Sequence, residues 1–154
     1  MVKSTLVCDA PIGRVWRITT DFDSYAEWHP AFSLSGEAES GAKLTLSFRA
    51  APGPLPTMNT DARVTRLDRP NAVAWRIGIR GVLQIEHGFD LAKAGSGTRI
   101  RHWMRCTGLL SRIGAKAFLG KTESNLAVVT RSLAAFLRRA TTIARYAPAR
   151  GRSH

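Results

Sequence analysis

Apolar and polar residues along the chain follow two different periods. Between residues 32 and 106 they alternate one by one in short runs bounded by turn-forming residues, a pattern typical of β-strands. The six runs are residues 32–37, 42–49, 58–67, 73–79, 82–91 and 98–106, and residues 2–8 form a seventh. Because the connections between successive runs are short, we predict an antiparallel meander.

The stretch from residue 111 to residue 146 has the helical period instead. Its apolar residues recur three or four positions apart and leave charged residues on the opposite side. The apolar stripe consists of Phe118, Leu126, Val129, Leu133, Phe136, Leu137 and Ala140. We predict a helix from about residue 124 to residue 144, roughly 30 Å long, which must bury its stripe against the sheet.

Two glycines set the first part of this stretch apart. Gly114 and Gly120 each cost about 1 kcal/mol in a helix interior relative to alanine, whereas residues 124–144 contain no glycine. We therefore expect a firm C-terminal half that anchors the fold and a looser first half that gates the access of a ligand.

Residues 9–30 separate the first predicted strand from the second. Asp9 is a candidate N-cap and Pro11 suits a first helical turn, so a short helix is expected to follow. A second short helix or turn is expected over residues 21–28, where Pro30 stops it. These two helices would cover one end of the sheet.

The alternation also assigns the two faces of the predicted sheet. One face carries apolar residues such as Leu46, Trp75 and Phe89, and the other face is wet and mostly basic. The 154 residues therefore predict one α+β domain over residues 1–146, with a seven-stranded antiparallel sheet against a long C-terminal helix. Residues 147–154 are expected to form a disordered basic tail.

The composition is that of a soluble globular protein, with 44% hydrophobic and 22% charged residues. No apolar run approaches the ~20 residues of a membrane span, and no signal-peptide core precedes Asp9. We expect a cytoplasmic protein of unassigned oligomeric state. Cys8 and Cys106 should be buried thiols at opposite ends of neighbouring antiparallel strands, too far apart for a disulfide.

The net charge of +12 is the one unusual feature of the composition. From Arg112 onward there are nine basic residues against a single acid, Glu123. Such a field favours an acidic protein or an anionic membrane, although a solvated helix face and a basic tail also account for it. No aromatic residues interleave with the terminal arginines, which argues against nucleic acid. The candidate contact surface comprises Arg99, Arg101, Trp103, Arg105 and the C-terminal arginines.

Several motifs together give the chain a family resemblance. They are Asp9-Ala10-Pro11 with Val15-Trp16, the run from Asp21 to Pro30, Gly88-Phe89-Asp90-Leu91, Gly97-Thr98-Arg99 and Thr107-Gly108-Leu109. Over about residues 2 to 142 the chain resembles the START-like (SRPBCC) superfamily with its helix-grip fold, and within it the polyketide cyclase/dehydrase and lipid transport proteins. The motif around Trp28 departs from the usual form, because His29 stands where asparagine is usual.

The resemblance implies a curved sheet wrapped around the long helix, with an apolar cavity between them. Members of the family bind lipids, hormones or polyketide-like molecules, and some of them cyclise or dehydrate their ligands. No cofactor is implied. Because a fold does not fix an activity, the resemblance leaves binding protein and enzyme as alternatives.

A pair of histidines is the sharpest local signal. If the turn of the last hairpin lies at about residues 93–96, Phe89 faces Ile100 and His87 lies directly opposite His102. Directly opposed side chains have β-carbons roughly 5 Å apart. Two cavity histidines can orient a ligand or transfer a proton, whereas zinc wants a third ligand that no spacing provides. Alternatively, one histidine is a hydrogen-bonded core residue and the other lies near solvent.

The remaining candidates are residues expected to line the cavity. Polar Thr122 and Asn125 are placed near the inner face of the helix, whereas Asp61 falls on the wet face and is a weak candidate base. The full candidate ligand-binding set is Trp28, Leu46, Phe48, Trp75, Ile77, His87, Phe89, His102, Met104, Phe118, Thr122 and Leu126. Three functions follow as hypotheses: a carrier of a hydrophobic small molecule, a cyclase/dehydrase-type enzyme, and a basic module for an acidic partner or membrane.

Overall fold

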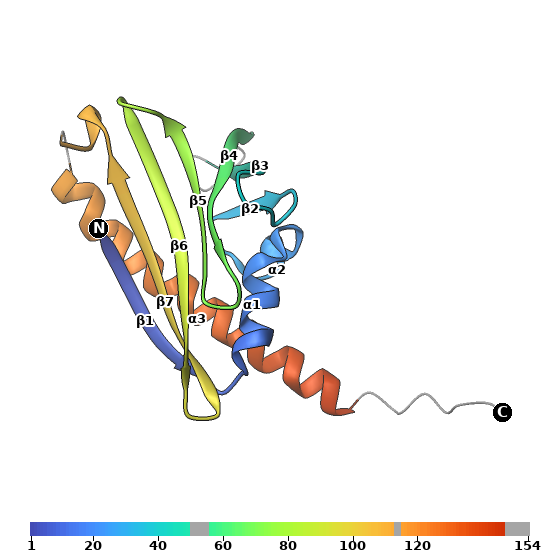
Figure 1. Ribbon diagram of the computed structural model, residues 1–154. Coiled ribbons are helices and arrows are strands. Elements are labelled where there is room, and N and C mark those ends of the chain that lie inside the picture. Colours follow the sequence, from blue (N-terminus) through green and yellow to red (C-terminus); the bar gives the residue numbers. More distant parts are fainter. Residues whose placement is uncertain (50–55, 113–114, 147–154) are drawn as a thin grey trace.

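A seven-stranded antiparallel sheet and one long helix form the two layers of the protein in a computed structural model (Figure 1). The structure describes residues 1–49, 56–112 and 115–146, and within these all side chains except those of residues 112–123 and 140–146. No helix in this part of the chain is long and apolar enough to cross a membrane. The predicted tail, residues 147–154, lies outside the described residues.

The sheet contains all seven predicted strands. They are β1 (Val2–Cys8), β2 (Phe32–Ser35), β3 (Lys43–Arg49), β4 (Thr57–Asp68), β5 (Ala72–Ile79), β6 (Leu83–Ala94) and β7 (Gly97–Thr107). Their order is β1-β7-β6-β5-β4-β3-β2, so strands 2 to 7 form a meander and the first strand pairs with the last. The predicted antiparallel meander and the helix-grip architecture are therefore confirmed.

Short helices connect the first two strands, as expected. They are α1 (Ile12–Thr20), the 3-10 turn η1 (Phe22–Ser24) and α2 (Tyr25–Trp28). The N-cap of α1 is Pro11 and not Asp9, so the proposed cap was wrong. The buried Tyr25 hydroxyl donates to the Thr19 carbonyl at 2.8 Å, which fastens the second helix to the end of the first.

The long helix α3 (Ala115–Tyr146) follows the 3-10 turn η2 (Leu109–Arg112). It begins nine residues before the predicted start, because the ~1 kcal/mol cost of Gly120 does not interrupt a sequence otherwise rich in good helix formers. Gly114 and the side chains of the first turns lie outside the described residues, so the expected gate stays a prediction.

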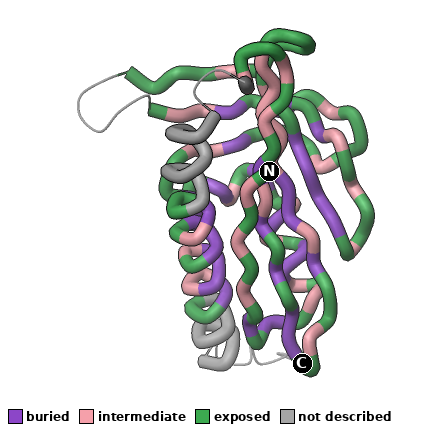
Figure 2. The backbone as a smooth tube through the Cα atoms, turned by 90° about the vertical axis from the view of Figure 1, so that its left-hand side faces the viewer, coloured by how far each residue is buried: buried purple, intermediate pink, exposed green. Residues whose placement is uncertain are grey.

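The apolar stripe of α3 faces the concave side of the sheet. Leu126, Val129, Leu133 and Leu137 are all buried, and in Figure 2 the buried side of the helix is turned toward the strands. The Ser132 hydroxyl also donates to the Trp28 carbonyl at 2.5 Å, which ties α3 to α2. These contacts fix the helix across the sheet and leave the inner faces of the strands directed toward it.

The inner face of the sheet carries the residues that alternation assigned to it. A bulge in β4 between Val64 and Arg66 shifts the register, so that Val64 and Leu67 both pack against the core. Cys8 pairs with Thr98 at the far end of β7 from Cys106, and both thiols are free, as expected. Cys8 is buried, but Cys106 is only half-buried near the end of its strand, so the expected burial was wrong for this thiol.

Candidate ligand-binding site

The two histidines of the last hairpin share the inner face but are not opposite each other. Phe89 is the register partner of His102, and Met104 is the partner of His87. The prediction was wrong because the turn contains only two residues, Gly95 and Ser96, and a tighter turn moves the register by two positions. An even shift keeps both side chains on the same face, so their rings still lie diagonally adjacent with centroids 6.2 Å apart.

These histidines belong to a continuous cluster of rings. His102 stacks on Phe89 with centroids 4.3 Å apart, and His87 lies parallel to Trp75 with centroids 5.9 Å apart and an interplanar angle of 6°. Further ring contacts extend the cluster across the inner face. The cluster comprises Phe22, Tyr25, Trp28, His29, Phe32, Trp75, His87, Phe89 and His102.

Five nitrogen atoms within this cluster are buried without a hydrogen-bond partner among the described residues. They are Trp28 Nε1, Trp75 Nε1, His87 Nδ1 and both ring nitrogens of His102. The backbone of Leu126 interacts with the His102 ring and offsets part of the lowering of its pKa by burial, but the two groups do not meet in the geometry of a hydrogen bond. Because buried polar groups in native proteins are nearly always paired, this concentration on one face is unusual.

His29 is a third imidazole of the cluster, and little in the sequence pointed to it. Its Nδ1 accepts hydrogen bonds from the backbone N–H groups of Ala31 and Phe32, both at 3.3 Å. The proton of the neutral ring is therefore assigned to Nε2. Its ring centroid lies 3.7 Å from that of Phe32. The one signal was a histidine between Trp28 and Pro30, in a loop where strand alternation has no meaning.

Burial keeps all three imidazoles neutral at neutral pH. It lowers the pKa of His87 from 6.5 to about 4, and together with repulsion from His87 it lowers the pKa of His29 to about 3. The pKa of His102 is well below its usual value, first because of burial and then because of repulsion from the other two histidines. A neutral imidazole offers one hydrogen-bond donor and one acceptor, so the cluster provides hydrogen-bonding groups that carry no charge.

Burial along the inner face decreases toward one end of the sheet. In β5, Val73 and Trp75 are fully buried, Ile77 is half-buried, and Ile79 is exposed. In Figure 2 the strands likewise change from buried to intermediate and exposed colours toward the end where β5 turns into β6. His102 lies in the buried part, and His87 lies at the transition.

The other predicted site residues divide between these two regions. Leu46, Met104 and Leu126 are buried, whereas Phe48 is half-buried on the same face as Ile77. Phe118 and Thr122 lie outside the described side chains. Asn125 is exposed, so its expected position near the inner face was wrong. The helical period predicted Asn125 beside the buried stripe because it precedes Leu126, but its side chain lies on the exposed side of the helix.

Metal-binding chemistry finds no support in the described residues. Among them no three His, Cys, Asp or Glu side chains lie together in a way that suits a metal ion. Asp61 is exposed on the outer face, where it borders a surface cleft, and it is therefore remote from the ring cluster.

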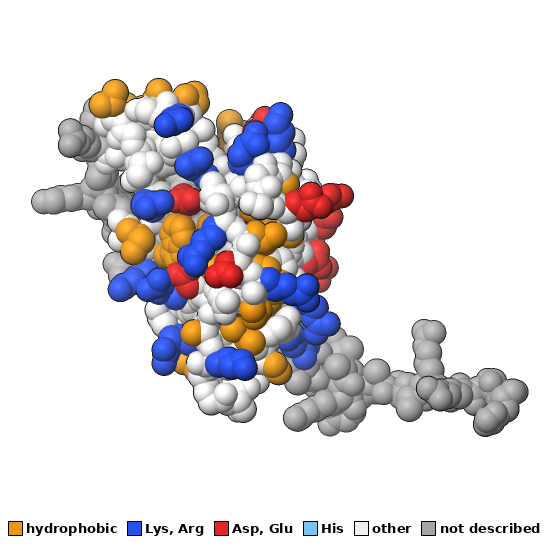
Figure 3. Space-filling view, in the orientation of Figure 1, with side chains coloured by type: hydrophobic (Ala, Val, Ile, Leu, Met, Phe, Trp, Pro, Cys, Tyr) orange, Lys and Arg blue, Asp and Glu red, His pale blue; other side chains and the backbone are white. Residues whose placement is uncertain are grey.

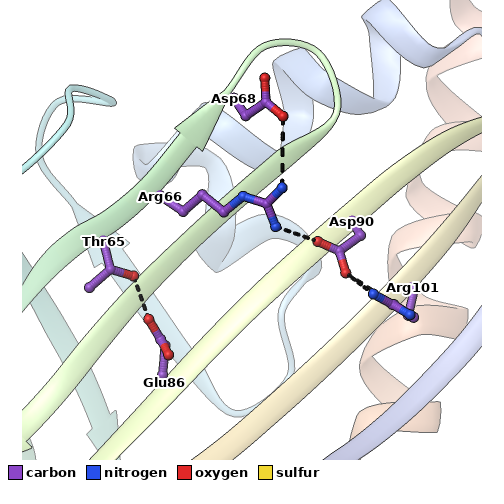
Figure 4. A network of polar contacts seen from close by, with 6 residues as sticks. All are labelled: Thr65, Arg66, Asp68, Glu86, Asp90 and Arg101. Carbon is purple, nitrogen blue, oxygen red and sulfur yellow. Dashed lines mark hydrogen bonds and ion pairs between the residues drawn. The ribbon is translucent and has the colours of Figure 1, made fainter.

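The outer face of the sheet carries a different kind of network (Figure 4). Asp90 accepts hydrogen bonds from Arg66 at 3.2 Å and from Arg101 at 2.6 Å. Glu86 accepts from Thr65 at 2.8 Å and from Arg105 at 2.5 Å. Burial alone would raise the pKa of Glu86, but these bonds and the nearby arginine charges outweigh burial and lower it.

These pairings change the picture of the predicted basic surface. Arg101 and Arg105 were candidates for contacting an anionic partner, and both are paired with carboxylates. They border a cleft of about 410 Å³ together with Trp103 and Arg66. Figure 3 shows this face, with Asp and Glu side chains set among the Lys and Arg side chains.

Comparison with known proteins places the chain in a family. The sequence profile described as "Polyketide cyclase / dehydrase and lipid transport" matches residues 1–144. The chain belongs to this family. No curated protein matches the chain, so the family assignment rests on the profile and agrees with the fold.

Solved structures with the same fold share little sequence with this family member. TTHA0849 from Thermus thermophilus is 17% identical with a TM-score of 0.68, over 91% of this chain and 98% of its own. MLL2253 from Mesorhizobium loti is 17% identical with a TM-score of 0.69, over 90% and 96%. DynU16, described as a putative protein in the dynemicin biosynthetic locus, is 21% identical with a TM-score of 0.68, over 90% of this chain and 47% of its own. At these identities the likeness concerns the fold.

Proposed function

We propose that the protein binds a hydrophobic or aromatic small molecule, lipid-like or polyketide-like, between the inner face of the sheet and α3. The observation that carries this proposal is the group of buried nitrogens on Trp28, Trp75, His87 and His102 that have no partner among the described residues. A buried polar atom left unpaired costs about 1–3 kcal/mol. A ligand whose oxygen atoms pair with these nitrogens removes that cost and gains orientation.

The surroundings of these nitrogens support an apolar ligand body. The rings of Trp75 and Phe89 flank the two histidines, and half-buried Ile77 and Phe48 continue the apolar face toward the open end of the sheet. Burying apolar ligand surface there contributes about 25 cal/mol per Å². The ligand therefore combines an apolar or aromatic body with a few polar atoms.

The neutral charge state of the imidazoles limits which polar groups the ligand can carry. With a pKa of about 4, His87 is protonated in roughly one molecule in a thousand at pH 7. Neutral imidazoles match carbonyl and hydroxyl oxygens, whereas a carboxylate needs a cationic partner on the buried face. We therefore infer an uncharged ligand that carries carbonyl or hydroxyl groups. The family description, polyketide cyclase / dehydrase and lipid transport, agrees with such a molecule.

The second candidate is an enzyme of the cyclase/dehydrase type. Its supporting observation is the adjacency of His87 and His102, whose free ring nitrogens can accept a proton from a bound ligand. Their lowered pKa values make both rings poor proton donors at neutral pH, which favours the binding role. In an enzyme, replacing both histidines by leucine should slow turnover by about 10²-fold or more.

Native mass spectrometry of the purified protein, followed by identification of any retained small molecule, tests the proposal. The wild type should retain one uncharged, largely apolar molecule, or take one up from a lipid extract. His102→Leu should retain less of it, whereas Arg99→Ala, on the exposed outer face of the same strand, should retain as much as the wild type. A wild type that neither retains nor takes up a molecule would contradict the proposal.

A further inference from the structure

Exposed aliphatic side chains gather at the end of the sheet where β5 turns into β6. Ile79 is 69% exposed, Val82 43%, Leu109 73% and Leu110 48%. We call these four residues the apolar tip. Figure 3 shows hydrophobic side chains gathered at this end of the molecule with Lys or Arg side chains beside them. Large aliphatic groups displayed together on a surface are typical of contact sites.

Backbone hydrogen bonds hold the two connections that carry these residues side by side. The Leu109 N–H donates to the Gly81 carbonyl at 3.1 Å, and the Leu110 N–H donates to the Val82 carbonyl at 3.0 Å. Gly108 permits this approach, because it has a φ of +105° and a Cβ there would lie 2.5 Å from the Val82 carbonyl oxygen. The tip is therefore a fixed display built from two connections that are distant in sequence.

The sequence around the tip carries more basic than acidic residues. The described stretches that lead to this end, residues 43–49, 56–61, 76–85 and 104–112, contain one acid, Asp61. They contain six basic residues, Lys43, Arg49, Arg76, Arg80, Arg105 and Arg112. Asp61 borders the same surface cleft as Ile79, and Glu86 is paired with Arg105, so these two carboxylates offset part of the positive charge. The end of the molecule thus combines exposed aliphatic groups with positive charge.

We propose that the apolar tip inserts into the surface of a membrane that contains anionic lipids. Aliphatic groups bury into the region between headgroups and acyl chains, while the flanking arginines attract the negative surface at about 1 kcal/mol per residue. A protein partner is the less favoured occupant, because the four residues of the tip include none of the aromatic anchors typical of protein interfaces. The docking does not rest on the proposed function.

The position of the apolar tip links membrane docking to ligand binding. The tip lies at the end where the inner face becomes exposed, beyond Ile77 on β5, and His87 lies further along the same face as the partner of Trp75. A docked molecule would turn this exposed end toward the lipid. If the inner face binds an apolar ligand, that ligand exchanges with the membrane without crossing water, and this second step does rest on the proposed function.

Vesicle flotation tests the docking with the full-length protein. Vesicles of equal parts phosphatidylcholine and phosphatidylglycerol should bind the wild type, vesicles of phosphatidylcholine alone should bind it less, and added salt should weaken binding. The double variant I79S/L109S should bind the anionic vesicles at least about tenfold more weakly. Arg80→Glu should also weaken binding, whereas Arg99→Glu, at the other end of the sheet, should weaken it less.

The matched control is Val7→Ser, which removes an aliphatic side chain that is 54% exposed at the opposite end of the sheet, on β1. It should bind like the wild type, and thermal unfolding should verify that every variant is folded. Equal vesicle binding by wild type and I79S/L109S, an equal loss in Val7→Ser, or no binding of anionic vesicles by the wild type would each overturn the docking. His102→Leu should float like the wild type, which separates this proposal from the proposed function.

Discussion

His102 and Phe89 are register partners on β7 and β6, and their rings stack with centroids 4.3 Å apart. The stacking fixes the imidazole plane but satisfies neither of its nitrogens, and both remain buried without a partner among the described residues. The side chain is therefore held in place by packing while its hydrogen-bonding capacity stays free. In a ligand-free protein such a group lowers stability, and in a ligand-bound protein it orients the ligand.

The first prediction is that two histidine substitutions change the stability of the protein in opposite directions. His102→Leu should stabilise the ligand-free protein by about 1 kcal/mol, because an unpaired buried polar group is replaced by an apolar one. His29→Leu should destabilise it by about 1–3 kcal/mol, because the backbone N–H groups of Ala31 and Phe32 lose their acceptor. Urea unfolding measures both. A loss of stability in both variants would show that His102 is satisfied in the native protein.

The second prediction concerns the dependence of stability on pH. Burial lowers the pKa of His87 to about 4 in the folded protein, whereas the unfolded chain has the usual value near 6.5. Between these two pH values the unfolded state binds more protons than the folded state. The free energy of unfolding therefore has its full value above pH 6.5 and falls as the pH drops toward 4. The loss is on the order of 3 kcal/mol.

Urea unfolding across this pH range, in the wild type and in His87→Leu, isolates the contribution. The carboxylates titrate in both proteins, so the difference between the two curves belongs to His87 and its neighbours. The wild type should lose more stability than the variant from pH 6.5 to pH 4. Parallel curves would mean that water reaches the imidazole and that its pKa is close to the usual value.

The third prediction concerns the outer face. A Cβ on Gly88 would lie 2.4 Å from Cζ2 of Trp103, so the indole covers this glycine on β6. Gly88→Ala should destabilise the protein by about 1–3 kcal/mol. In the background of Trp103→Ala the same substitution should cost much less, because the clash is gone.

Gly13→Ala is the control for this pair. Among the described residues no heavy atom outside the adjacent residues and the nearby backbone of α1 lies within 4 Å of a Cβ built on Gly13. This substitution should therefore leave stability unchanged or raise it by up to about 1 kcal/mol. An equal cost of Gly88→Ala with and without Trp103 would refute the close approach of the indole.

The fold was predictable because its signals are local and repeated. Each strand of the sheet shows its own alternation, and the buried stripe of Leu126, Val129, Leu133 and Leu137 has helical spacing. The register of the last hairpin was not predictable to the residue. Gly95-Ser96 can form either the centre of a two-residue turn or the end of a longer one, and both put His87 and His102 on the inner face.

The site was predictable only where it lies on strands. Trp75, Phe89 and His102 follow from alternation, whereas His29 reaches the cluster from the loop after α2, and no period assigns a direction to a loop residue. Periodicity also distinguishes inner from outer faces but not buried from half-buried positions along one face. The difference between Trp75 and Ile79 arises from how far the covering elements extend, which is a property of the packed structure.

The proposed binding mode requires that unpartnered nitrogens of the ring cluster bind an oxygen atom of an apolar ligand. Isothermal titration of wild type and His102→Leu with 2-naphthol and with naphthalene examines this requirement, because these two probes differ only by a hydroxyl group. The wild type should bind 2-naphthol about tenfold more tightly, which corresponds to one net hydrogen bond, and His102→Leu should lose this preference. Equal affinity of the wild type for both probes, or binding of neither, would contradict the proposed binding mode.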